Sequence, residues 1–270
     1  MKTAISALSI LLLLMAGCAN PRFSPAREIR GRELIRVLNV EHNYDKAVSD
    51  SRGEMVYALL RSAQEIHIYQ GARRVNSIGG LGFERTNFQR LADIGVDTDG
   101  GLLALDTAQK LLRKFSPEGR LMAELQLKGL QQPELFCVGS DGTLFVHDSA
   151  SSEIVSFSRL DASELYRFGR FELELPSWLA CSRNYVYAYS RERDRTYVFY
   201  QLGQHKWTWE GLWAFDDFDN PIQSQPETYE SRSFRQPRAI SVNGAVQTET
   251  RDFEIKMTRL IYGGSNDAAQ

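Results

Sequence analysis

Short apolar runs separated by polar turns recur along most of the chain. The clearest example spans residues 91–127, where apolar residues 91–96 lead through Asp99-Gly100 into residues 102–105. A polar break at 106–109 and a turn at 116–119 frame two further apolar runs, 111–115 and 121–127. This pattern predicts a meander of three or four short strands, which buries only one face and needs neighbours of the same kind.

The same pattern returns elsewhere at a regular spacing. The stretch that begins at Ile94 is repeated 42 residues later, from Phe136 through Asp141-Gly142, and degenerate copies begin near Val48, Leu179 and Ala239. Gly or Asn stands in each turn, where a tight hairpin needs a positive φ. Each copy continues into a third strand, for which we expect residues 65–69, 111–115, 153–157, 196–200 and 253–257. The chain therefore reads as about five copies of one unit.

A period of 42 to 47 residues with four strands per unit predicts an all-β fold, a β-propeller of four-stranded antiparallel blades. Residues 91–127, and to a lesser degree 134–168, resemble the NHL-type propeller repeat, with its Asp and Gly turn positions and its third strand ending on Phe. This resemblance implies the propeller fold but no particular chemistry. An ordinary β-sandwich is the competing fold.

The number of blades depends on two segments. The alternating stretch Leu34–Val40 precedes the first unit, and we expect it to close the ring by pairing into the last blade, which lacks a clear fourth strand. Residues 214–236 are about twenty residues in excess, either an insertion or the remnant of a sixth blade. The sequence thus predicts five or six blades.

The first eighteen residues combine a positive charge, an apolar run and a cysteine. Lys2 precedes an apolar run, and the sequence Leu14-Met15-Ala16-Gly17-Cys18 resembles the bacterial lipobox, with Met15 in place of the usual leucine. The resemblance implies cleavage after residue 17, lipidation of Cys18 and, because Ala19 follows, a periplasm-facing anchor in the outer membrane. An ordinary secretory signal is the alternative. We therefore expect a signal peptide at 1–17, a tether at 18–30, a propeller at 31–262 and a disordered tail at 263–270.

Composition limits the classes of partner. The formal net charge of −2 provides no overall positive field for nucleic acid, so we expect no nucleic-acid partner. The expected partners are membrane lipid, through Cys18, and a protein of the cell envelope.

No residue pattern identifies a catalytic, metal or cofactor site. The four histidines (His42, His67, His147 and His205) have no metal-ligand spacing, and we interpret them as unrelated. Asp97, Asp106 and Asp148 recur at strand ends, where they are expected to bind turn amides. Residues 216–220 form the only acidic cluster that could suggest calcium, and we interpret it as a solvated loop. Cys137 and Cys181 lie in neighbouring units, either as buried apolar residues or as a disulfide.

The aromatic stretch 205–215 is the least ordinary segment. Trp207, Trp209, Trp213 and Phe215 face one side if the chain is extended. In one interpretation, the stretch is the last strand of the fourth unit and these side chains pack against the next blade. In the other, they form an exposed patch that binds a partner or a glycan and is bordered by residues 229–238.

From these patterns we expect a lipid-anchored, non-enzymatic propeller that acts as an interaction or envelope-assembly scaffold. The alternatives are a metal-dependent lactonase-like or lyase-like enzyme with its site at the channel mouth, and a glycan-binding module.

Overall fold

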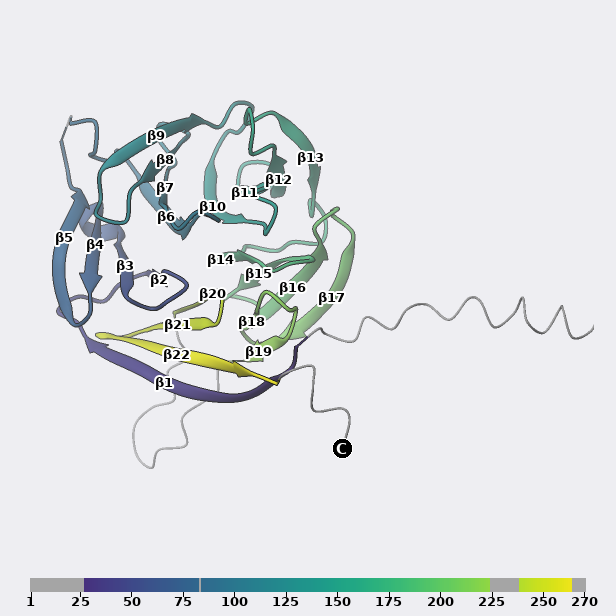
Figure 1. Ribbon diagram of the computed structural model, residues 1–270. Coiled ribbons are helices and arrows are strands. Elements are labelled where there is room, and N and C mark those ends of the chain that lie inside the picture. Colours follow the sequence, from purple (N-terminus) through teal and green to yellow (C-terminus); the bar gives the residue numbers. More distant parts are fainter. Residues whose placement is uncertain (1–26, 83, 224–237, 264–270) are drawn as a thin grey trace, which may run out of the picture.

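The computed structural model describes residues 27–82, 84–223 and 238–263, and they form a β-propeller of five four-stranded antiparallel blades. Figure 1 shows the blades around a central axis, with β2, β6, β10, β14 and β20 innermost and β5, β9, β13, β17 and β1 at the rim. The alternative of six blades is not supported, since the described residues form five. No described helix is long and apolar enough to span a membrane.

Four blades are built from consecutive strands. Their strands, in chain order, are β2 (Lys46–Ser49), β3 (Met55–Leu60), β4 (Glu65–Gln70) and β5 (Arg73–Gly79) in blade one; β6 (Leu91–Val96), β7 (Leu102–Asp106), β8 (Leu111–Phe115) and β9 (Leu121–Gln126) in blade two; β10 (Pro133–Val138), β11 (Leu144–Asp148), β12 (Glu153–Phe157) and β13 (Glu164–Phe168) in blade three; and β14 (Trp178–Cys181), β15 (Tyr185–Ser190), β16 (Arg195–Tyr200) and β17 (His205–Glu210) in blade four. Gly100 and Gly142, in two of the turns between first and second strands, both have a φ of +86°.

The two ends of the described chain meet in blade five. Its inner strands are β20 (Ala239–Asn243), β21 (Val246–Arg251) and β22 (Glu254–Tyr262), and the N-terminal strand β1 (Ile29–Asn39) supplies the outer strand by pairing with β22. The expected ring closure is therefore confirmed. Because β1 starts at Ile29, the propeller begins two residues before its predicted start at residue 31.

A short hairpin lies between blades four and five. It consists of β18 (Trp213–Phe215) and β19 (Pro221–Gln223), and it accounts for the described part of the twenty residues in excess. Its buried residues Ala214, Phe215 and Ile222 share a core cluster with Tyr187 of blade four and Ile240 of blade five. The hairpin thus fills the space between two blades without forming a four-stranded blade of its own.

The outer strand of every blade carries a β-bulge at the same position. One extra residue stands opposite the third strand in each blade: Val75, Met122, Leu165, Lys206 and, in β1, Ile35. The side chains of Val75, Met122 and Leu165 are each more than half exposed. Bulges twist a strand and interrupt its ladder of hydrogen bonds, so the rim presents five irregular edges.

Candidate functional site

The structure offers three candidate sites: an aromatic cluster at the side of blade four, a cavity in the central channel, and a group of histidine and tyrosine side chains in blade one. Cys18, the predicted lipidation site, lies outside the described residues, as do residues 229–237 of the segment expected to border the aromatic stretch.

The aromatic side chains predicted to share one face do meet, although they stand on two strands. Trp207 and Trp209 lie on β17, whereas Trp213 and Phe215 lie on β18, because the chain turns at Gly211, which has a φ of +80°. The stretch is therefore not one continuous extended segment, which was the condition for a single shared face. The ring of Trp209 nevertheless lies 5.3 Å from that of Trp207, 5.0 Å from that of Trp213 and 5.4 Å from that of Phe215, centroid to centroid.

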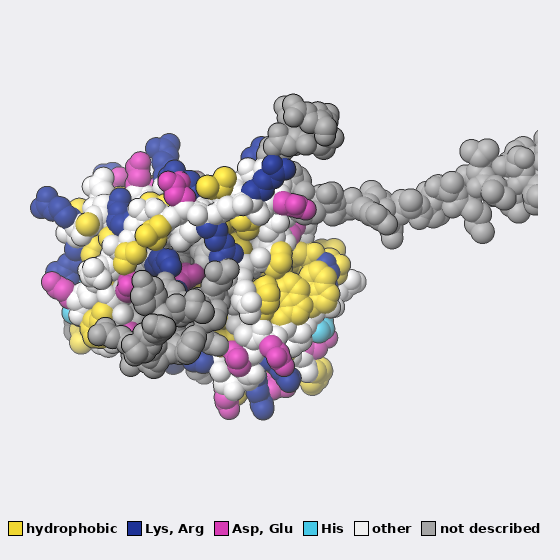
Figure 2. Space-filling view, turned by 90° about the horizontal axis from the view of Figure 1, so that it is seen from below, with side chains coloured by type: hydrophobic (Ala, Val, Ile, Leu, Met, Phe, Trp, Pro, Cys, Tyr) yellow, Lys and Arg dark blue, Asp and Glu magenta, His cyan; other side chains and the backbone are white. Residues whose placement is uncertain are grey.

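Exposure divides this aromatic cluster (Trp207, Trp209, Trp213 and Phe215) into a buried and an open end. Phe215 is buried in the core between blades four and five, Trp209 and Trp213 are half-buried, and Trp207 is 38% exposed. Tyr200 and Leu202, near the β16–β17 turn, are also exposed. Figure 2 shows a hydrophobic patch with basic atoms at its border, on the side of the molecule where Figure 1 places β17 to β19. The buried end therefore packs against the next blade, as the first interpretation expects, whereas the open end is exposed and its role as a binding patch stays a prediction.

A cation lies against the open end. The bulge of β17 places Lys206 and Trp207 together opposite Val198, and the Lys206 ammonium lies 3.7 Å from the ring centroid of Trp207, 4.3 Å from that of Tyr185 and 4.7 Å from that of Tyr200. It also donates a hydrogen bond to the Tyr185 hydroxyl. This arrangement fixes the Lys206 side chain and holds the exposed Trp207 ring in place.

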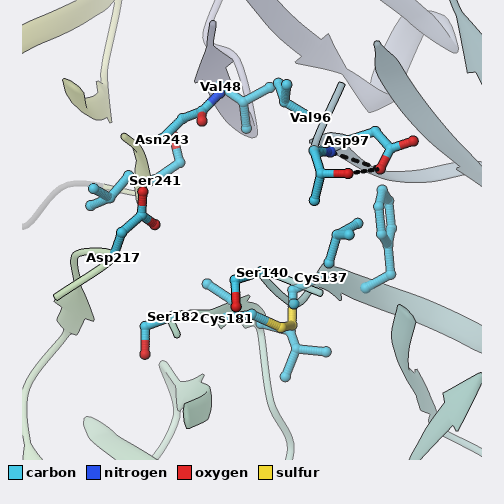
Figure 3. A pocket seen from close by; sticks show the side chains of 18 of the residues that line it. Val48, Val96, Asp97, Cys137, Ser140, Cys181, Ser182, Asp217, Ser241 and Asn243 are labelled. Atoms are coloured by element: carbon cyan, nitrogen blue, oxygen red, sulfur yellow. Dashed lines mark hydrogen bonds between the residues drawn. A yellow bond between two sulfur atoms is a disulfide. The ribbon is translucent and has the colours of Figure 1, made fainter. Parts of the chain in front are cut away.

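The central channel contains a cavity of about 330 Å³ at one face of the ring. Its walls are the ends of the inner strands of all five blades, joined by Asp217 from the β18–β19 turn (Figure 3). Asp97, Ser140, Ser182, Ser241 and Asn243 contribute the polar part of the wall. Cys137 and Cys181 form a disulfide in the wall, with a Cα–Cα distance of 5.6 Å, so the alternative of two unbonded cysteines is not observed.

A buried ion pair lies at the floor of this cavity. The Lys46 ammonium is 2.8 Å from the Asp93 carboxylate, and both side chains are almost completely buried. The Asp93 carboxylate also accepts the backbone N–H of Phe136, so it links the first strands of blades one, two and three. The sequence pattern did not single out Asp93, because this residue stands within an apolar strand and its partner Lys46 is 47 positions away.

The carboxylates singled out in the sequence bind backbone amides, as expected. Asp106 accepts the N–H groups of Gln89 and Arg90, and Asp148 accepts those of Gln131 and Gln132. In both blades, the two amides belong to the residues directly before the first strand, β6 or β10. Asp97 accepts the N–H of Thr98 and pairs at 2.6 Å with the ammonium of Lys114, which it shares with Asp99.

The acidic segment 216–220 is the turn of the β18–β19 hairpin. Asp216 is fully buried, contrary to the interpretation of a solvated loop, and its carboxylate accepts the backbone N–H groups of Phe218 and Asn220. Asp219 accepts hydrogen bonds from Ser182 and Asn184 of blade four. Asp217 keeps contact with the solvent of the cavity, yet enclosure by the surrounding walls, together with the charges of Asp216 and Asp219, raises the pKa of its carboxyl group.

Two of the four histidines are in contact, which corrects their interpretation as unrelated. The rings of His42 and His67 lie 5.4 Å apart, and His67 is buried. The Nδ1 atom of His67 is 2.6 Å from the Tyr44 hydroxyl and its Nε2 atom is 2.8 Å from the Glu65 carboxylate, so both ring nitrogens are occupied. His147 is buried in β11 and His205 is exposed on β17. Within the described ranges, no group of three or more His, Cys, Asp or Glu side chains could hold a metal ion.

Comparison with known proteins shows the fold alone. No family model matches the chain, and no curated protein matches its sequence. A virginiamycin B lyase from Staphylococcus aureus is similar in structure at a TM-score of 0.51 and 11% identity, over 86% of this chain and 100% of the lyase. The Pan2 WD40 domain of Neurospora crassa is similar at a TM-score of 0.52 and 9% identity, over 81% of this chain and 89% of that domain. The chain spans only 64% of the length of a streptogramin B lyase, over 80% of its own length, at a TM-score of 0.45 and 11% identity.

Proposed function

We propose that this protein is a lipid-anchored propeller that faces the periplasm and binds a protein partner of the cell envelope without catalysing a reaction. The observation that supports the proposal best is the open end of the aromatic cluster, where Trp207, Tyr200 and Leu202 are exposed beside the ammonium of Lys206. Exposed aromatic residues with an adjacent cation are typical of the residues that dominate the binding energy of protein interfaces.

The architecture suits such a role. The Lys206 ammonium and the rings around it are already ordered, so a partner would not have to immobilise them on binding. The signal-like segment that ends at Cys18 supplies the proposed anchor, and the fold itself is shared by scaffolds and enzymes.

The test is covalent capture at the proposed surface. A photoreactive p-benzoylphenylalanine in place of Trp207, in the full chain expressed in its own cell envelope, is expected to give a discrete protein adduct on irradiation. The matched control carries the same group in place of Leu165, the exposed bulge residue of blade three. Identical adducts at both positions, or none at position 207, would contradict the proposal. An adduct that glycosidases remove and proteases do not would indicate a glycan instead.

A channel enzyme is the second candidate, favoured by one observation. The cavity holds a carboxyl group, Asp217, whose pKa is raised by enclosure and by neighbouring charges, as is common for groups at catalytic sites. Metal analysis of the purified full chain tests this candidate in its metal-dependent form, for which the described residues provide no group of three or more ligands; a stoichiometric metal ion would favour the enzyme.

A further inference from the structure

The central cavity presents hydrogen-bond acceptors to whatever enters it. The Ser241 hydroxyl donates to the carbonyl of Ala47, and the side-chain amide of Asn243 donates to the carbonyl of Ser49, both at 2.9 Å. The Ser182 hydroxyl donates to Asp219 at 2.8 Å. Because the hydroxyl protons of Ser241 and Ser182 are used between neighbouring elements of the ring, the remaining capacity of these hydroxyls is to accept. The side chain of Asn243 keeps its amide oxygen as an acceptor and one further N–H as a donor.

The charges of the cavity do not cancel. Lys46 is paired with Asp93 at the floor, and Lys114 is paired with Asp97 at the wall. Among the described residues, no Lys or Arg forms an ion pair with Asp217. Its carboxylate accepts the backbone N–H of Gly244, and the charges that act on it are those of Asp216 and Asp219. Among the described residues, the negative charge of Asp217 therefore has no cationic partner.

The turn does not need Asp217 for its own geometry. Asp216 and Asp219 bind the amides and side chains that shape the hairpin and attach it to blade four. Figure 3 shows Asp217 directed into the space between Ser241 and Ser182. Part of the wall is apolar and consists of Val48, Val138 and Val242. Such a wall suits the methylene groups of an alkyl chain that ends in a charged group.

We propose that the central cavity binds the cationic end of an alkylammonium or alkylguanidinium group, with Asp217 as its counter-ion and the Ser and Asn oxygens of the wall as acceptors. Two sources supply this chemistry, a free small amine and a Lys or Arg side chain of a polypeptide. The cavity is lined by other residues than the aromatic cluster, so this inference does not depend on the protein partner proposed above.

The experiment is calorimetric titration of the purified full chain in detergent. Cadaverine and agmatine represent the free amines, and the blocked tripeptides Gly-Lys-Gly and Gly-Arg-Gly represent a polypeptide. Their neutral analogues, with norleucine and citrulline at the central position, are expected to bind at least tenfold more weakly. Binding of the peptides alone would identify a side chain as the ligand, and binding of the free amines would show that a small amine suffices.

Two variants and one control make the test specific. Asp217→Asn keeps the shape of the side chain and is expected to weaken binding at least tenfold, and Ser140→Phe is expected to block the cavity without changing its charge. Glu192→Gln removes the same charge from the exposed β15–β16 turn and should leave binding unchanged. Binding that survives Asp217→Asn, or equal affinity for cationic and neutral probes, would overturn the proposal. Unchanged melting temperatures verify that the variants are folded.

Discussion

At the scale of single residues, His147 is the buried group with the clearest consequence for stability. Its side chain lies in β11, and among the described residues its Nδ1 atom has no hydrogen-bond partner. Burial lowers its pKa to about 4, although the charges of Glu134 and Asp148 act in the opposite direction. The ring therefore stays neutral in the folded protein at a pH where an exposed histidine, with a pKa of about 6.5, is protonated.

The sign of the pH dependence follows from this difference. Between about pH 6.5 and pH 4 the unfolded chain binds a proton at His147 that the folded chain does not, so the free energy of unfolding falls as the pH falls. We expect the wild type to lose about 2 to 3 kcal/mol more than His147→Gln between pH 7.5 and pH 4.5, since one pKa unit corresponds to about 1.4 kcal/mol. Urea denaturation at both pH values measures this, and parallel losses in the two proteins would refute it.

At the scale of elements, the bulged outer strands determine what the rim of the ring can do. The repeated extra residue interrupts each blade at its open edge, which discourages pairing with strands of other molecules. In blade four the same bulge brings Lys206 next to Trp207. One recurring irregularity thus protects the rim and, in a single blade, shapes the proposed binding surface.

The strand β1 depends on a few buried contacts. Leu38 is buried in a cluster that includes Ile255 and Met257 of β22, whereas the neighbouring Val37 is partly exposed. We expect Leu38→Ala to lower the free energy of unfolding by about 2 to 5 kcal/mol, as is usual for a buried leucine. Val37→Ala is the matched control and should cost less than half as much. Thermal and urea denaturation compare the two, and equal losses would mean that β1 is not held by its buried face.

At the scale of the whole molecule, the described chain begins beside the β18–β19 turn. The carbonyl of Arg27 accepts a hydrogen bond from Asn220, and its guanidinium lies 5.5 Å from the ring centroid of Phe218, in the turn that also carries Asp217. The nine residues from Cys18 to Arg27 can reach about 30 Å at most when extended. If Cys18 carries lipid, the β18–β19 turn lies within about this reach of the membrane surface.

The anchor has its own test. We expect Cys18→Ser to move the protein from the membrane fraction to the soluble fraction of the envelope, because the apolar segment before it is too short to span a bilayer comfortably. Fractionation and immunoblotting of cells that express either protein measure the change. Ser6→Ala is the control within the same segment and should stay in the membrane fraction. Retention of Cys18→Ser in the membranes would refute the anchor.

The sequence predicted the ring more completely than its sites. Strands such as Leu111–Phe115 and Glu153–Phe157 were predictable to the residue, because apolar runs between turns leave few alternatives. The strand Arg73–Gly79 was not, since five of its seven positions are exposed and show no alternation. The cavity could not be predicted either, because it forms where the ends of five distant strands and the Asp217 turn converge.

The pairing of β1 with β22 also orders events during synthesis. Within the propeller, residues 29–39 are synthesised before the other strands, and their partners at 254–262 follow only after more than 200 further residues. Until then blade five lacks its third strand and the ring cannot close. A chain cut before Glu254 would leave β1 without its partner, so ring closure serves as a check that translation has reached the end of the propeller.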